Sequence, residues 1–443
     1  MMTMLYRRWC EIARRFAAVP AVHDLAAGRS WTFGELAADA AAAALPEEGV
    51  VFARGQDAEF ILTVLRAWRA GAVVCPLEPD QAPPAVPPPP PGMAHLKLTS
   101  ATTGPARCIV FTADQLAADV DHLVPTMGLR PDWPNLGAIS LAHSYGFSNL
   151  VTPLLLHGIP LILPGSALPE AVRRAAARFP AVTLPAVPAL WSAWYEAGAI
   201  PSNVRLAISA GASLPLPLEE AVFARHGLKI HNFYGSSECG GIAYDASAAP
   251  RADPAAVGTA VRGVGLSVAA DGCLEVRGGA VGDGYWPEAS AALTSGCFHT
   301  SDLAELADGQ VRLLGRLSDV INVAGRKVSP ETIERVLATH PAVRECAVFA
   351  RPSGEPERGE DIVALVVARE AIAASVLRSF VASRLPAWQV PRVWRFAPRL
   401  PVNDRGKSPR GQLGHLLAEQ GAALGDGRPC PPWSRTRAGA TST

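Results

Sequence analysis

Short apolar runs alternate with amphipathic stretches along the first half of the chain, and this alternation constrains the fold more than any other feature. Residues 50–53 and 72–76 are apolar runs of strand length, and residues 58–70 between them have helical spacing. A strand–helix–strand unit implies a parallel sheet. The alternation resumes over residues 95–213. The sequence therefore predicts an α/β fold built on doubly wound sheets.

Two changes in composition indicate the domain organisation. Residues 81–92 contain seven prolines, which predicts an extended linker because proline lacks the N–H donor that helices and sheets need. A glycine-rich, β-leaning stretch fills residues 258–314, and a mixed pattern restarts after Gly315. We expect a multi-subdomain N-terminal domain over residues 1–314 with an abbreviated first subdomain, a small α+β domain over residues 315–418, and a disordered tail over residues 419–443.

The charge balance excludes several classes of partner. The 443 residues include 40 Lys and Arg against 40 Asp and Glu, so no broad field attracts nucleic acid or an anionic membrane. No apolar stretch reaches the ~20 residues that a membrane-spanning helix needs. The eight cysteines form no CxxC pair, which favours reduced thiols in a cytoplasmic protein. A small molecule is the expected partner.

A hydroxyl-rich loop follows the apolar run that ends at Leu98. Hydroxyls, a glycine and a cation within ten residues can surround phosphate oxygens with donors. The loop is not a Walker motif, because a strand follows it and the next helix starts only at Thr112, in a capping box with Gln115. Taken alone, the loop is weak evidence for phosphate binding, because Ser/Thr-rich loops are common. The candidate phosphate-binding residues are Thr99, Ser100, Thr102, Thr103, Gly104 and Arg107.

A second candidate segment follows the strand at residues 229–231. Its tyrosine can stack on a base, a hydroxyl can meet a phosphate, and a carboxylate can hold Mg²⁺, which prefers oxygen ligands. The alternative is a strand-end turn with an exposed glutamate. A serine-hydrolase elbow is excluded because the segment does not fit GxSxG. Its residues are Asn232, Phe233, Tyr234, Gly235, Ser236, Ser237 and Glu238.

Three further segments lie in the C-terminal third. Asp302 and Arg316 flank a short strand, and such a pair could hold ribose hydroxyls or be a surface ion pair of little energetic value. Residues 323–327 form a glycine-bearing loop that includes Lys327. Residues 404–410 carry Lys407 beside a glycine; taken alone, a lysine in such a loop is usually solvated.

Taken in order, these five segments resemble the superfamily of adenylate-forming enzymes, which includes acyl-CoA synthetases, the adenylation domains of peptide synthetases and firefly luciferase. The resemblance runs from about residue 31 to residue 413. It implies a large N-terminal domain of stacked subdomains and a small, mobile C-terminal domain that rotates after adenylation, with the active site between them. ATP, Mg²⁺ and coenzyme A are the implied cofactors and co-substrates.

The resemblance also implies roles for individual residues. The hydroxyl-rich loop would hold pyrophosphate, and Lys407 would bridge the substrate carboxylate and the α-phosphate as an electrostatic catalyst. Glu238 would bind Mg²⁺ and Ser237 would contact the α-phosphate. The remaining implied roles are adenine binding for Gly211, Ala212, Ser213 and Tyr234, ribose binding for Asp302 and Arg316, the hinge for Ser318, the pantetheine tunnel for Gly325, and ATP contact for Lys327.

The sequence departs from the family pattern in the phosphate loop. Ala101 replaces a usual glycine, Ala106 a usual proline and Arg107 a usual lysine. Arginine keeps the charge and offers a planar fork, so phosphate contact remains compatible with this change. The altered loop leaves open a nucleotide-binding pseudoenzyme, whereas the presence of both Glu238 and Lys407 argues for an enzyme.

Residues 142–147 resemble the family segment that lines the acyl pocket. His143 either faces the substrate or is a hydrogen-bonded core residue. No acidic residue follows to meet a substrate amine, so a fatty or aromatic acid fits better than an amino acid. The expected acceptor is coenzyme A, and the alternative is an acyl carrier protein. The candidate acyl-pocket residues are His143, Ser144, Tyr145, Cys239, Gly240 and Gly241.

Overall fold

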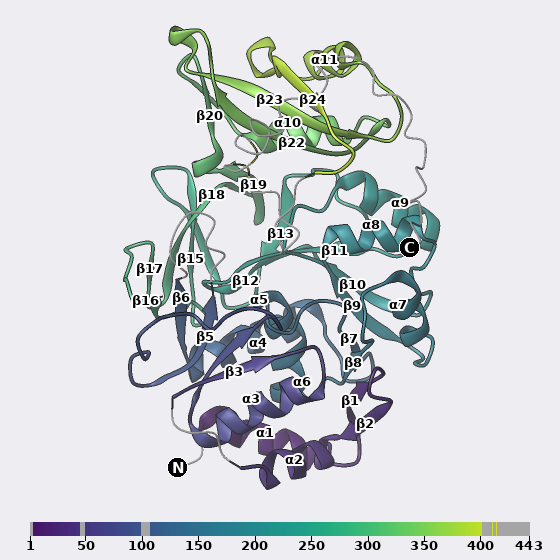
Figure 1. Cartoon of the computed structure of the whole chain (residues 1–443), viewed down its shortest axis with the longest axis vertical. Coiled ribbons are helices and arrows are strands. Elements are labelled where there is room, and N and C mark those ends of the chain that lie inside the picture. Colours follow the sequence, from purple (N-terminus) through teal and green to yellow (C-terminus); the bar gives the residue numbers. More distant parts are fainter. Residues whose placement is uncertain (1–2, 45–48, 99–106, 401–409, 411–412, 414–443) are drawn as a thin grey trace, which may run out of the picture. The chain divides into compact units, whose positions relative to one another are not determined.

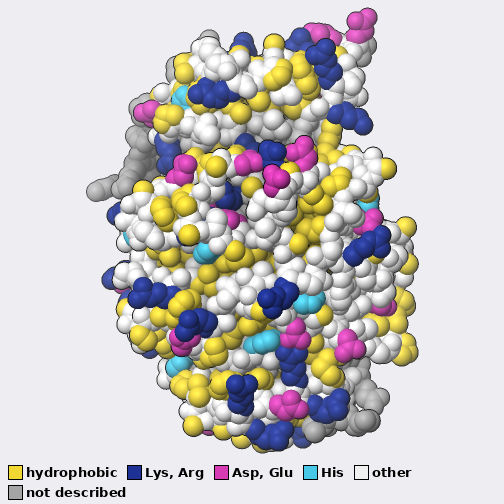
Figure 2. Space-filling view, turned by 180° about the vertical axis from the view of Figure 1, so that it is seen from behind, with side chains coloured by type: hydrophobic (Ala, Val, Ile, Leu, Met, Phe, Trp, Pro, Cys, Tyr) yellow, Lys and Arg dark blue, Asp and Glu magenta, His cyan; other side chains and the backbone are white. Residues whose placement is uncertain are grey.

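The computed structural model describes residues 3–44, 49–98, 107–400, 410 and 413. The chain divides into two compact units, Met1–Leu313 and Leu314–Thr443, and each is described by itself. Within the described ranges, none of the helices is both long and apolar enough to cross a membrane. Positive and negative side chains are interspersed on the face shown in Figure 2.

The first unit contains the expected doubly wound sheet (Figure 1). Its strands β11, β10, β9, β7, β8 and β1 are parallel neighbours in that order, and β2 closes the edge antiparallel to β1. Their bounds are β1 (Pro20–Asp24), β2 (Arg29–Thr32), β7 (Asn135–Leu136), β8 (Leu161–Leu163), β9 (Val182–Ala186), β10 (Val204–Ser209) and β11 (Ile230–Ser236).

Helices cover both faces of this parallel sheet, which confirms the predicted α/β class. On one face, Trp191 and Trp194 of α8 pack against Ala207 of β10 and Ile230 of β11. On the other, Phe147 belongs to a core that includes Ile208 of β10. The helices of these layers are α4 (Ala113–Met127), α5 (Ser144–Gly146), η1 (Phe147–Val151), α6 (Thr152–His157), α7 (Pro169–Ala176), α8 (Pro188–Glu196) and α9 (Leu216–His226).

A second, five-stranded sheet has the order β16-β6-β5-β4-β3. The predicted strand–helix–strand unit is confirmed as β3 (Val50–Arg54), α3 (Ala58–Ala70) and β4 (Val73–Leu77), with β3 and β4 parallel. The other elements here are α1 (Met4–Arg15), α2 (Phe33–Ala42), β5 (Met93–Leu98), β6 (Cys108–Thr112) and β16 (Gly284–Trp286). The Thr112–Gln115 capping box expected at the start of α4 is present.

The proline-rich segment connects β4 to β5, which are parallel, without forming a helix. A parallel connection usually contains a helix, but the prolines of residues 81–92 prevent one here. Side chains of other segments hold this connection in place. One guanidinium nitrogen of Arg54, at the end of β3, donates to three of its carbonyls, those of Glu78, Pro79 and Gln81. The Trp286 indole donates to the Pro87 carbonyl at 2.9 Å. The predicted extended linker is therefore a fixed part of the surface.

The β-leaning stretch continues the large sheet beyond β11 with mostly antiparallel strands. Strand β18 bulges opposite β15: Cys273 faces Leu303 and Glu275 faces His299, so β18 uses two more residues than its partner between these pairs. The bulge projects residues 300–302 from the ladder. The strands are β12 (Gly240–Tyr244), β13 (Ala256–Ala260), β14 (Gly265–Val268), β15 (Cys273–Arg277), β17 (Leu293–Thr294), β18 (Cys297–Ala307) and β19 (Gln310–Arg316).

The second unit is a small α+β structure with its own core, in which Ile333 and Leu337 of α10 pack against strands such as β22. Ser329 stands at the N-cap of α10, but its hydroxyl donates to Glu331 at 2.5 Å and makes no capping hydrogen bond. The elements are η2 (Leu317–Asp319), β20 (Ile321–Val323), β21 (Arg326–Val328), α10 (Pro330–Ala338), β22 (Val343–Pro352), η3 (Pro356–Arg358), β23 (Glu360–Ala368), α11 (Ala374–Ala382), η4 (Ala387–Gln389) and β24 (Val393–Phe396).

Candidate functional site

The carboxyl ends of β9, β10 and β11 lie at one edge of the large sheet. The parallel register aligns Ala186, Ser209 and Asn232 across the three strands. Loops that follow parallel strands at this edge are where α/β folds bind ligands. The predicted adenine loop, Gly211 to Ser213, follows β10 and is exposed. The 232–238 segment ends β11, so both nucleotide segments come to the same edge.

Tyr234 and Asp302 are brought together although 68 residues separate them. The Tyr234 hydroxyl donates to the Asp302 carboxylate at 2.5 Å. Asp302 projects from the bulge in β18, where its backbone N–H donates to the Thr300 hydroxyl at 3.1 Å. Both side chains are half-buried. A ring that can stack on a base and a carboxylate that can accept from sugar hydroxyls therefore share one surface.

Glu238 is held by a residue that sequence reasoning missed. The Tyr285 hydroxyl donates to a Glu238 carboxylate oxygen at 3.1 Å. Burial raises the pKa of Tyr285 well above its usual range, and the neighbouring Glu238 charge raises it further. Tyr285 is therefore a donor at neutral pH. The predicted phosphate ligand Arg107 lies over the Tyr285 ring, 5.9 Å from its centroid.

Ser144 and Ser237 are predicted site residues from different segments, and they lie in contact. Their hydroxyl oxygens are 2.9 Å apart. His143 caps the short helix α5, because its Nδ1 accepts from the Tyr145 N–H at 3.2 Å. A hydrogen-bonded His143 was one of the two open alternatives. The Tyr145 hydroxyl donates to the Ile208 carbonyl at 3.4 Å, and its ring lies 6.0 Å from that of Phe233.

Asp119 of α4, which the sequence did not indicate, lies directly against two predicted acyl-pocket residues. Its carboxylate accepts from Ser148 at 2.6 Å and from the Gly241 N–H at 3.1 Å. Gly240 has φ +68°, and a Cβ there would lie 2.1 Å from an Asp119 oxygen. Gly240 and Gly241 lack a side chain, so the buried carboxylate of Asp119 can lie close to their backbone. Cys239, Gly240 and Gly241 are buried, so these glycines are packing positions against α4.

Lys97 is a third residue that the sequence analysis missed. It lies in the apolar strand β5, is 5% exposed, and places its ammonium 4.5 Å from the Phe111 ring centroid. Burial lowers the pKa of Lys97, and the acidic groups of Asp119, Cys239 and Glu238 act in the opposite direction. A lysine within an apolar strand was the signal that could have found it, since Lys is rarely buried without a partner.

The other predicted residues of the first unit are part of strand β11 or lie outside the described residues. Asn232 and Phe233 are buried in β11, where Phe233 belongs to the main core. Gly235 and Ser236 complete the strand, and the Ser236 hydroxyl accepts from the Glu238 N–H at 3.2 Å. The predicted residues Thr99, Ser100, Thr102, Thr103, Gly104 and Lys407 lie outside the described residues.

The second unit carries the remaining predicted residues. Arg316 and Ser318 are exposed at η2, and Gly325 and Lys327 are exposed at the β20–β21 turn, where Gly325 has φ +79°. Arg410, three residues after the predicted catalytic lysine, forms ion pairs with three carboxylates. These are Asp319 at 2.7 Å, Glu331 at 2.5 Å and Glu334 at 2.7 Å.

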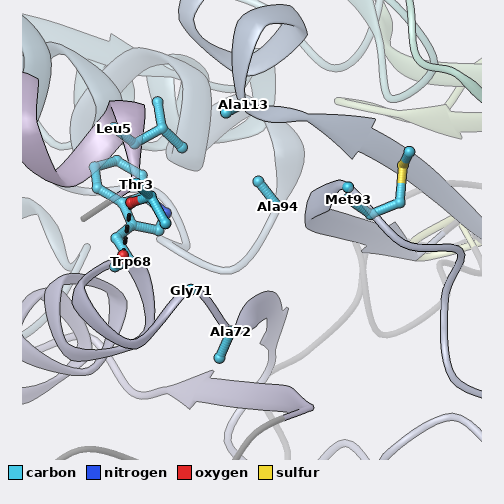
Figure 3. Close-up of a pocket in the computed structure, with 9 residues that line it drawn as sticks. Thr3, Leu5, Trp68, Gly71, Ala72, Met93, Ala94 and Ala113 are labelled. Atoms are coloured by element: carbon cyan, nitrogen blue, oxygen red, sulfur yellow. Dashed lines mark hydrogen bonds between the residues drawn. The ribbon is translucent and has the colours of Figure 1, made fainter. Parts of the chain in front are cut away.

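A separate pocket lies in the first unit between the start of α1, the end of α3 and the start of β5 (Figure 3). Thr3 spans one wall, donating to the Trp68 carbonyl at 2.6 Å. The lining contains no charged side chain and no predicted site residue. It is formed by Thr3, Leu5, Trp68, Gly71, Ala72, Gly92, Met93, Ala94 and Ala113. Nothing in this lining offers acid–base or phosphate chemistry.

Comparison with known proteins identifies the family. The family model for AMP-binding enzymes matches residues 80–286, and that for the AMP-binding enzyme C-terminal domain matches residues 332–407. A probable 2-succinylbenzoate–CoA ligase of Mycobacterium tuberculosis is 30% identical over 344 residues, which cover 72% of this chain and 84% of that protein. The chain belongs to the AMP-binding enzymes. The expected adenylate-forming family, in which acyl-CoA synthetases fall, is confirmed.

Other relatives of this AMP-binding enzyme agree. A feruloyl-CoA synthase of an Amycolatopsis species is 30% identical over 357 residues, covering 75% of this chain and 72% of that protein. A sulfoacetate–CoA ligase of Cupriavidus necator is 29% identical over 353 residues, covering 75% and 69%. The predicted reaction class is thereby confirmed: the chain is an acid–thiol ligase that activates a carboxylic acid as its acyl-adenylate before transfer to coenzyme A.

Solved structures share the fold. ATP-bound MatB from Rhodopseudomonas palustris has a TM-score of 0.79 at 22% identity, covering 92% of this chain and 99% of that one. MenE of Bacillus subtilis, in complex with its acyl-adenylate intermediate, has a TM-score of 0.78 at 21% identity, covering 95% and 99%. The expected division into a large α/β part and a smaller C-terminal part agrees with these folds.

Proposed function

We propose that the nucleotide of the adenylation reaction binds at the carboxyl edge of β10 and β11. Adenine would lie between the Gly211–Ser213 loop and the Tyr234 ring, and the ribose hydroxyls would donate to Asp302. The hydrogen bond between Tyr234 and Asp302 is the observation that carries this proposal. This bond holds the Tyr234 ring, which can stack on a base, next to the Asp302 carboxylate, which can accept from sugar hydroxyls. Glu238 lies in the same segment as Tyr234.

Glu238 is the proposed Mg²⁺ ligand. Mg²⁺ takes hard oxygen ligands and usually shares them with substrate phosphates and water. The half-buried Glu238 carboxylate fits this chemistry, because Tyr285 occupies one of its oxygens and orients the group. When bound, the ion would neutralise charge on the ATP phosphates. Arg107, which lies over the Tyr285 ring, would supply a further positive charge for the leaving pyrophosphate.

Lys407 is the proposed electrostatic catalyst of adenylation. Its ammonium would bridge the attacking carboxylate and the α-phosphate, where charge develops in the transition state. Arg410 would position the segment that carries Lys407, because three carboxylates of η2 and α10 hold its guanidinium. We expect Lys407→Ala to lower the adenylation rate by ~10²–10³, as loss of a preorganised donor does elsewhere. Acid-dependent ATP–pyrophosphate exchange measures this loss directly.

The substrate is proposed to be an aromatic acid, with a fatty acid as the second candidate. The rings of Tyr145 and Phe233 form an aromatic pair beside Ser144, and aromatic pairs favour further ring contacts. Relatives named for 2-succinylbenzoate, ferulate and p-hydroxybenzoic acid support the same class. Coenzyme A is the proposed acceptor, and an acyl carrier protein is the alternative.

A cytoplasmic location is proposed with this function. The seven cysteines among the described residues are free thiols, which fits the reducing compartment where such thiols persist. The substrates of the proposed reaction are also small soluble molecules.

One experiment tests the function in two stages. ATP–pyrophosphate exchange is measured over a panel of aromatic and fatty acids, and the supporting acid is then offered coenzyme A or carrier protein as acceptor. We expect exchange with an aromatic acid and a mass increase on coenzyme A. Exchange with no acid would favour the pseudoenzyme, and acylation of carrier protein alone would favour the alternative acceptor.

A further inference from the structure

A group of metal-ligating side chains lies outside the nucleotide site, where the β14–β15 turn meets β18. Asp271 lies in the turn, Cys273 begins β15, and His299 lies in β18. One ligand atom from each residue can be chosen so that the three lie within 4.8 Å of one another. This is the one such group of three His, Cys or acidic side chains among the described residues. The nucleotide chemistry uses none of them.

The geometry of the group is set by hydrogen bonds to Asp271. One carboxylate oxygen accepts from the Cys273 N–H at 3.0 Å, and the other lies 3.0 Å from Nε2 of His299. Gly272 lies between Asp271 and Cys273 and has φ +83°, a conformation that suits glycine. This conformation folds Asp271 back toward Cys273. The backbone therefore presents a carboxylate, a thiol and an imidazole to one point.

The dimensions suit zinc. Sulfur at ~2.3 Å and nitrogen or oxygen at ~2.0–2.2 Å in a tetrahedron place ligand atoms about 3.3–3.6 Å from one another. The ligand atoms of Asp271, Cys273 and His299 lie within 4.8 Å of one another. Small side-chain rotations would bring them to the separations of a tetrahedral zinc site. Asp271 and His299 are 42% and 35% exposed, so they can move, whereas Cys273 is buried and fixed. Solvent access through the exposed pair also leaves room for a water as fourth ligand.

We propose that Asp271, Cys273 and His299 form a binding site for a thiophilic divalent cation, of which Zn²⁺ is the best match. Thiolate and imidazole ligands select zinc over Mg²⁺, which prefers oxygen alone. The bound ion would fasten the β14–β15 turn to β18, next to the bulge that presents Asp302. The site is separate from the Mg²⁺ proposed at Glu238.

The test is a Co²⁺ titration of the full-length, metal-free protein without ATP or acid. Co²⁺ reports thiolate ligation through a charge-transfer absorption band. We expect one equivalent to bind, with the band present, and Zn²⁺ to displace it because soft thiolate ligands select zinc. Excess Mg²⁺ should not displace it. No saturable binding, or binding without the thiolate band, would overturn the proposal.

Matched variants assign the ligands. Cys273→Ser should abolish the band and weaken binding by about tenfold or more, since loss even of groups that orient metal ligands costs 10–100-fold. Cys297→Ser, on the same strand as His299, is the control and should bind as wild type. His299→Ala, at a partly exposed position, tests the site even if Cys273→Ser fails to fold. A band unchanged in His299→Ala, or lost in Cys297→Ser, would contradict the assignment.

Discussion

The two ends of strand β11 both gather charged and polar side chains, but they satisfy them differently. At the amino end, Lys229 pairs with Glu219 and with Asp245, and Arg251 donates to Glu219 at 2.9 Å. These side chains are at most 9% exposed. At the carboxyl end, Tyr234, Glu238 and their partners are only half-buried.

The different burial of the two ends of β11 indicates different roles for them. A fully buried charge must find all its partners within the protein, because leaving it unpaired costs several kcal/mol. The amino-end network is closed in this way and links α9 to the sheet through residues next to β11 and β12. At the carboxyl end, Tyr234 donates to Asp302 and Tyr285 donates to Glu238, and these four side chains remain partly exposed to solvent. Stability and chemistry are thus assigned to opposite ends of one strand.

The largest expected effect is on the stability of the amino end. Glu219→Gln leaves the ammonium of Lys229 and the guanidinium of Arg251 short of a charged partner in a buried setting. We expect a loss of about 3–5 kcal/mol in the free energy of unfolding, measured by denaturant titration. Glu220→Gln, the exposed neighbour on α9, is the control and should stay within about 0.5 kcal/mol of wild type. Equal losses of unfolding free energy in Glu219→Gln and Glu220→Gln would contradict the stabilising role assigned to the amino end of β11.

A smaller effect is expected on ATP binding at the carboxyl end. Tyr234→Phe keeps the ring but removes the hydroxyl that donates to Asp302. A hydrogen bond to a charged group contributes about 1.5–3 kcal/mol, so the KM for ATP should increase by roughly tenfold or more. Unfolding free energy should change little. A variant with lowered stability and an unchanged KM would show that this bond serves the fold.

The smallest effect is expected at the Ser144–Ser237 contact. Ser144→Ala removes one of two neutral hydroxyls that remain accessible to water. A neutral hydrogen bond contributes about 0.5–1.5 kcal/mol, so the KM for the acid or for ATP should rise two- to tenfold, about the same range of energy. Steady-state kinetics with each substrate varied in turn identifies which one Ser144 serves. A larger loss of kcat would instead place Ser144 at the reacting centre.

Local patterns in the sequence predicted much of the architecture. The α3 unit, the Thr112 cap and the position of residues 232–238 at a strand end all follow from short-range spacing. Ser329 shows the limit of that reasoning: it stands at the N-cap of α10, yet its hydroxyl donates to Glu331, only two residues away, and makes no capping bond. Short-range pattern places the backbone, but the partners of a hydroxyl depend on the side chains that can reach it.

Two of the missed site residues, Asp119 and Tyr285, share a physical cause. Asp119 meets Gly241 across 122 residues, and Tyr285 meets Glu238 across 47. Such contacts depend on how helices and strands pack, which no spacing rule reports. Lys97 lies in an apolar run and was passed over as part of a buried strand. The signal was present, since a lysine at a buried strand position requires compensation.

The most direct test of the account is acid-dependent ATP–pyrophosphate exchange by Glu238→Gln, with Glu219→Gln as its counterpart. We predict that Glu238→Gln loses ~10²–10³ in exchange rate while its unfolding free energy stays close to wild type. Glu219→Gln should lose stability yet, where folded, retain exchange. Full exchange activity in a folded Glu238→Gln would contradict the assignment of chemistry to the carboxyl end of β11.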